Sequence, residues 1–124
     1  ASLQGPSSSA NIRFFAVNYD GSSNVYGAGH YNDSNFLTVK YNSSGTIQWQ
    51  RILTKSGQTI NGNECGVGTD SSGNVFSMWR VNPGSGNYYL LLAKYNSSGT
   101  LQWTKKISIN GDEPRYPKLK IENA

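Results

Sequence analysis

The chain has 124 residues, of which 14 are glycine, 12% are aromatic and only 15% are charged. This composition is typical of β-rich extracellular, cell-surface or virion proteins rather than of cytosolic enzymes. The net charge of +4 is modest, and no apolar run approaches the roughly 20 residues of a membrane span, so we expect no membrane insertion.

The first half of the chain predicts four short strands after an N-terminal extension, residues 1–12. The strands are expected at residues 13–19, 24–30, 35–41 and 46–53, and together they form a first repeat, 13–53. Asn-Ser-Ser-Gly joins the last two, since Asn42 bonds to backbone two residues on and Gly45 takes a left-handed conformation. Alternation in the last strand predicts that Ile47, Trp49 and Arg51 share one face.

The second half repeats the first after an expected linker, residues 54–63. The motif "KYNSSGTIQW" at 40–49 returns as "KYNSSGTLQW" at 94–103, and Asp20 and Asn24 return as Asp70 and Asn74. The offset is 50 residues early in the unit and 54 later, because the loop 82–87 is longer. Strands are expected at 64–69, 74–81, 88–95 and 100–108, within a second repeat, 64–108.

The last segment, 109–124, reads as the first strand of a third repeat. Five of the 11 basic residues lie in the last twenty positions: Lys105, Lys106, Arg115, Lys118 and Lys120. Lysines that alternate along a terminal strand protect a sheet edge from aggregation, so we expect no nucleic-acid partner. With two full repeats and one strand, both ends are unfinished, and we expect the partners to be copies of the chain or further repeats of a longer chain.

A unit of four antiparallel strands in 40 to 50 residues has the size of a β-propeller blade. The motifs "YDGSSNVYGAG" and "KYNSSGTIQW" resemble the bacterial-type beta-propeller repeat, abbreviated SBBP, over nearly three quarters of the chain. The resemblance implies an all-β fold of antiparallel four-stranded blades. In such a fold Trp49 and Trp103 would occupy equivalent buried positions between blades.

Few residues of the sequence suggest catalysis or metal binding. Cys65 is the single cysteine and His30 the single histidine, so neither a disulfide within the chain nor a zinc site is expected. Asp20 with Asn24 lacks the full ligand pattern of a calcium loop, and turn capping explains the pair better. We expect no cofactor. An acid–base pair for glycoside cleavage would have to come from Asp33, Asp70 and Glu64.

Aromatic residues give the one candidate ligand site. They fall at or near the expected loop between the second and third strands of each repeat, where exposed rings could stack on a sugar face; they are Tyr26, Tyr31, Trp79, Tyr88 and Tyr89. The competing interpretation is that these rings fill the contact between sheets.

Three functions follow from these features. The favoured hypothesis is a non-enzymatic structural or adhesive β-repeat module of a larger surface assembly, such as a phage tail fibre, a virion decoration or a secreted fibre. A lectin-like module that binds surface glycans is the alternative, and an enzyme acting on polysaccharides is the third.

Overall fold

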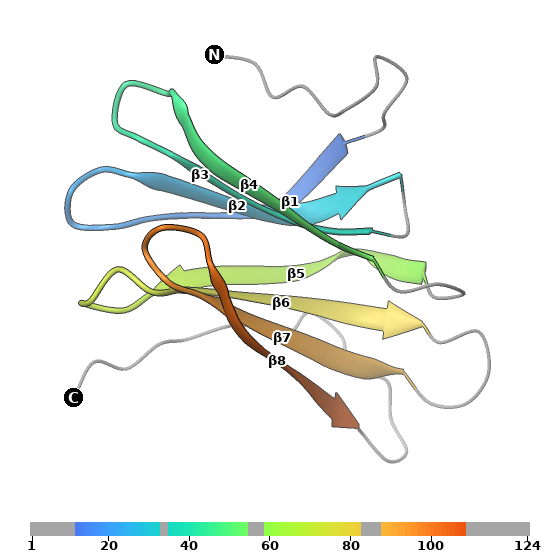
Figure 1. Ribbon diagram of the computed structural model, residues 1–124. Coiled ribbons are helices and arrows are strands. Elements are labelled where there is room, and N and C mark those ends of the chain that lie inside the picture. The colour runs from blue at the N-terminus through green and yellow to red at the C-terminus, as the bar shows by residue number, and fades with distance from the viewer. Residues whose placement is uncertain (1–11, 33–34, 55–58, 83–87, 109–124) are drawn as a thin grey trace.

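The computed structural model describes residues 12–32, 35–54, 59–82 and 88–108, which form eight strands and no helix (Figure 1). The strands are β1 (Ile12–Tyr19), β2 (Val25–Tyr31), β3 (Asn35–Tyr41), β4 (Ile47–Thr54), β5 (Thr59–Thr69), β6 (Val75–Asn82), β7 (Tyr89–Tyr95) and β8 (Leu101–Ser108). Within this part of the chain, no helix is long and apolar enough to span a membrane. The all-β prediction is confirmed.

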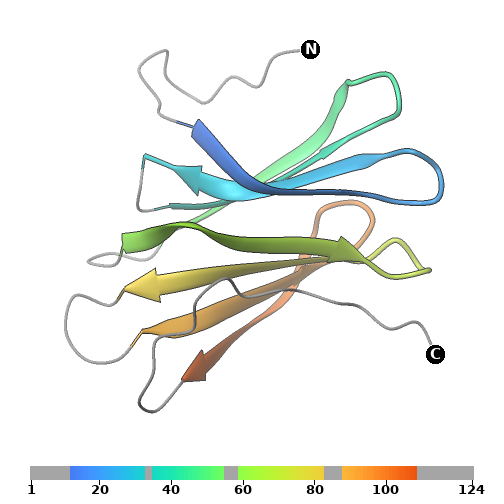
Figure 2. The ribbon, with the colours of Figure 1, turned by 180° about the vertical axis from the view of Figure 1, so that it is seen from behind.

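The strands form two four-stranded antiparallel sheets in which each strand pairs with its neighbour in sequence. The orders are β1-β2-β3-β4 and β5-β6-β7-β8. The first sheet lies over the second (Figure 1), and the view from behind shows β1 and β5 running next to each other (Figure 2). Each predicted repeat therefore corresponds to one sheet, although β5 begins at Thr59, inside the expected linker 54–63. The expected strand in 109–124 lies outside the described residues, as does the expected extension 1–12 except for Ile12, which begins β1.

The Asn-Ser-Ser-Gly turns have the geometry that their residue types predict. Asn42 Oδ1 accepts hydrogen bonds from the backbone amides of Ser44 and Thr46, both at 3.0 Å. The amide of Gly45 donates to Asn42 O at 3.0 Å, and Gly45 has a φ of 79°. The turn at 96–99 repeats each of these features, with a φ of 82° at its glycine. The local sequence therefore fixes both hairpins.

A bulge in β4 changes which side chains share a face. Ile47 lies opposite Tyr41 and Trp49 lies opposite Lys40, which leaves Gln48 without a partner in β3. Residues directly opposite in antiparallel strands point to the same face, and neighbours along a strand point to opposite faces. Ile47 and Trp49 therefore lie on opposite faces, and the predicted alternation is wrong at Ile47 because the extra residue shifts the pleat. The same bulge occurs in β8, so it belongs to the repeat.

Candidate functional site: the contact between the two sheets

Each sheet uses a different face in the contact between them. We call the face of β1–β4 that carries Ala28, Thr38 and Trp49 the donor face. The face of β5–β8 that receives it carries Val67, Ser77, Trp79, Ala93 and Tyr95, and we call it the acceptor face. The repeat gives each sheet a counterpart of both faces, although Gly29 stands at the position of Trp79 and Leu90 at that of Phe36. The contact within the chain joins the donor face of the first sheet to the acceptor face of the second.

The outer part of the contact places Trp49 and Arg51 of β4 on the turn 96–99. Trp49 Nε1 donates to Ser97 O at 3.2 Å, and Arg51 Nε donates to Gly99 O at 2.6 Å. The Trp49 ring lies 5.6 Å from the ring of Tyr95 and is 7% exposed. A Cβ atom at Gly99 would lie 2.7 Å from the indole of Trp49, so glycine is required there for close approach as well as for its backbone conformation.

The inner part of the contact is built around Trp79. Its indole is fully buried, packs 5.2 Å from the ring of Phe36 and donates from Nε1 to Gly29 O at 2.9 Å. Beside it, the hydroxyls of Thr38 and Ser77 are hydrogen-bonded at 2.8 Å. Burying such polar groups is costly unless they are paired, so these bonds restrict the two sheets to one relative position.

The turn before β2 shows how the repeat uses its acidic residues. Asp20 Oδ1 accepts from the amides of Ser22 and Asn24, while Oδ2 accepts from the Asn24 side chain at 2.9 Å and from the Tyr26 hydroxyl at 2.7 Å. Burial raises the pKa of Asp20, but these hydrogen bonds outweigh it and lower the pKa to about 2. Burial and the contact with Asp20 raise the pKa of Tyr26.

The matching carboxylate, Asp70, accepts the same bonds from Ser72 and Asn74. Burial opposes its ionisation, but the hydrogen bonds with Asn74 and Ser72, together with the charge of Lys94, lower its pKa. The oxygens of both carboxylates are thus engaged in turn bonds. No group of three or more His, Cys, Asp or Glu side chains that could hold a metal occurs among the described residues. Turn capping accounts for these residues, as the sequence suggested.

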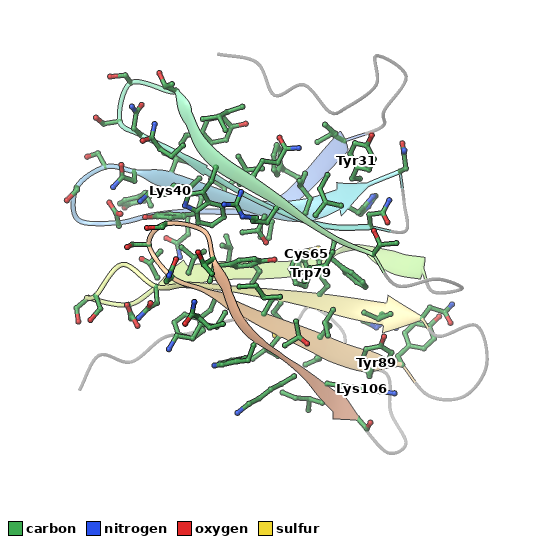
Figure 3. All side chains as sticks on the ribbon, in the orientation of Figure 1. Tyr31, Lys40, Cys65, Trp79, Tyr89 and Lys106 are labelled. Atoms are coloured by element: carbon green, nitrogen blue, oxygen red, sulfur yellow. The ribbon has the colours of Figure 1, made fainter. Side chains whose placement is uncertain are left out.

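The five aromatic residues proposed as a sugar platform do not form one surface. Tyr26, Trp79 and Tyr89 are 0%, 0% and 1% exposed, so the expectation of exposed rings is wrong for them. They sit in strands whose rings point into the core, and Figure 3 shows Trp79 beside Cys65 between the sheets. Tyr31, at the end of β2, is also buried. Tyr88 is half-buried, with the guanidinium of Arg80 4.3 Å above its ring. Ligand binding at Tyr88 stays a prediction.

The remaining candidates divide between the core and the undescribed residues. Cys65 is buried and forms no disulfide, and His30 is buried as well. Asp33 and the side chain of Glu64 lie outside what the structure describes, so the carboxylate pair stays untested.

Sequence reasoning did not predict the polar contacts that Arg51, Thr38 and Ser77 make across the two sheets. One signal could have found the inner contact. Trp79 occupies the position of Gly29 in the repeat, and a large ring matched with a glycine suggests that one packs on the other.

Searches against protein families, curated proteins and solved structures find no match.

Proposed function

We propose that this chain is a non-enzymatic structural or adhesive module of a larger surface assembly, built from sheets that stack like the blades of bacterial-type beta-propeller repeats. The observation that carries the proposal is the contact of Trp49 with the turn 96–99. Both partners belong to the ten-residue motif, one to each copy. Each repeat therefore carries both the tryptophan and the turn of the contact, so one repeat can stack on the next without limit. This is the property of a building unit.

The use of the polar residues supports a structural role. The hydroxyls of Thr38 and Ser77 bond to each other, and the carboxylates of Asp20 and Asp70 hold turns. These groups serve the fold, and an acid or base for catalysis would need an ionisable group aimed at a substrate. The composition, rich in Gly, Ser, Asn and Tyr, also fits surface and virion proteins. Burial of Tyr26, Trp79 and Tyr89 removes the main support for the lectin-like alternative.

Surface location is the testable part of this proposal. An antibody raised against the purified chain should label intact cells or particles that produce it, and protease added outside should remove the label. An antibody against an abundant cytosolic protein of the same preparation serves as the control for intactness. Labelling that requires permeabilisation would contradict the proposal.

A further inference from the structure

Among the described residues, the contact between the two sheets uses one face of each sheet. The donor face of the first sheet and the acceptor face of the second are joined. The acceptor face of the first sheet and the donor face of the second carry matching residues without the same contact. The exposure of those residues shows what is left open.

On the acceptor face, matching positions in the outer part differ in burial between the two sheets. Val67 in β5 is 5% exposed, while Val17, the matching residue in β1, is 69% exposed. Tyr95 is fully buried beneath Trp49, while the matching Tyr41 is half-buried. A Cβ atom at Gly45 would have no atom within 4 Å, in contrast to Gly99. The outer part of this face is thus open in the first sheet, whereas its middle, with Leu37 and Val39, is already fully buried.

On the donor face, the second sheet keeps the residues that make the outer contact. Trp103 matches Trp49 but is half-buried, and Lys105 matches Arg51. Lys105 Nζ lies 4.9 Å from the Trp103 ring, as the Arg51 guanidinium lies 5.6 Å from the ring of Trp49. An ammonium group can donate to carbonyl oxygens as Arg51 does. Ile107 matches Leu53 of the first sheet. Leu53 packs against the core, whereas Ile107 is 44% exposed and adds apolar surface to the donor face of the second sheet.

We propose that a second copy of this chain packs the acceptor face of its first sheet onto Trp103 and Lys105, with the turn 42–45 against them. This inference rests on the proposed role as a building unit. In this pairing the Trp103 indole N–H donates to Ser43 O of the second copy, and its ring packs on Tyr41 of that copy. Trp49 makes the same contacts with Ser97 O and Tyr95 within the chain. The contact joins different faces of two copies, so it is head-to-tail and forms rings or open filaments.

The contact between copies lacks the buried packing of Trp79 on Phe36 that the contact within the chain has. Gly29 stands where an acceptor face would need Trp79, and Leu90 stands where a donor face would need Phe36. The Phe14 ring already lies within 2.8 Å of the Cβ position of Gly27, over the middle of this face. The pairing therefore depends on its outer residues, and it is weaker than the contact within the chain and reversible with concentration.

Sedimentation velocity over a range of concentrations tests this pairing with variants that block one face each. Val17→Glu places a carboxylate on the open acceptor face, and Lys105→Glu places one against the turn carbonyls. Lys106→Glu is the matched control, since it makes the same charge change one residue along β8, on the opposite face. The wild type and the control should associate, and each blocked variant should bind about tenfold or more weakly.

Mixing supplies the decisive arm, because each blocked variant keeps one intact face. Val17→Glu and Lys105→Glu together should form one-to-one dimers and nothing larger. Tyr19→Glu, at a residue 75% exposed on the same strand, replaces Val17→Glu if that variant melts early. A wild type that stays monomeric at every concentration, blocked variants that associate like the wild type, or a mixture without dimers would overturn the inference. None of these results would alter the surface labelling, which tests the proposed function separately.

Discussion

Truncation of the two matching tryptophans should have unequal costs. The repeat alone predicts similar costs, but the structure buries Trp49 under the turn 96–99 and leaves Trp103 half-buried. Trp49→Ala removes a buried ring together with its hydrogen bond to Ser97 O, and should cost about 3 to 5 kcal/mol of unfolding free energy. Trp103→Ala removes a ring that is partly in water already and should cost about 1 kcal/mol.

The difference, about 2 kcal/mol or more, corresponds to roughly a thirtyfold change in the folding equilibrium. Urea unfolding followed by far-UV circular dichroism measures it, at a concentration too low for copies to associate. Equal slopes in urea would confirm that both variants unfold from the same compact state. Costs that agree to within about 0.5 kcal/mol would refute the placement of Trp49 between the sheets.

Three further predictions follow from the turns and from the polar groups between the sheets. Gly99→Val and Gly45→Val should each destabilise by more than about 1 kcal/mol in thermal melting, because both positions have positive φ, and Gly99→Val should cost more since its Cβ meets Trp49; a milder effect at Gly99 would contradict this. Thr38→Val should cost about 1 to 3 kcal/mol by leaving the Ser77 hydroxyl unpaired, and the double variant with Ser77→Ala should recover much of the loss; strictly additive losses would argue against the bond. The pKa of Asp20 in the folded chain, about 2, lies below its ordinary value of 3.8, so the ionised carboxylate stabilises the fold fully above about pH 4 and this stabilisation is lost as the pH falls through 2. Asp20→Asn should reduce the loss of unfolding free energy at acid pH, and an unchanged pH profile of stability would contradict the assignment.

The features that the sequence predicted correctly are local. The turns 42–45 and 96–99 depend on an asparagine that caps its own backbone and on a glycine at positive φ, and both properties belong to the residues themselves. Strand existence followed from the same turns and from the apolar runs between them. The repetition of these elements then predicted two antiparallel four-stranded units with the same strand order.

The features that it predicted incorrectly depend on long-range packing. Trp79 and Tyr89 read as loop aromatics because burial is decided by the other sheet and not by sequence neighbours. The face predicted for Ile47 was wrong because a one-residue bulge leaves no clear signature in the alternation of polar and apolar residues. Trp49 and Trp103 look alike in sequence, and only the position of each sheet in the stack distinguishes them.

The central claim is that one contact geometry serves both within the chain and between copies, and nuclear Overhauser effects measure it most directly. In a concentrated mixture of isotope-labelled and unlabelled chains, the Trp49 indole N–H should show effects to residues 97–99 of its own chain. The Trp103 indole N–H should show matching effects to residues 43–45 of the other copy. Absence of the Trp49 effects would contradict the stacking of the sheets, and their presence without the Trp103 effects would contradict the pairing of copies.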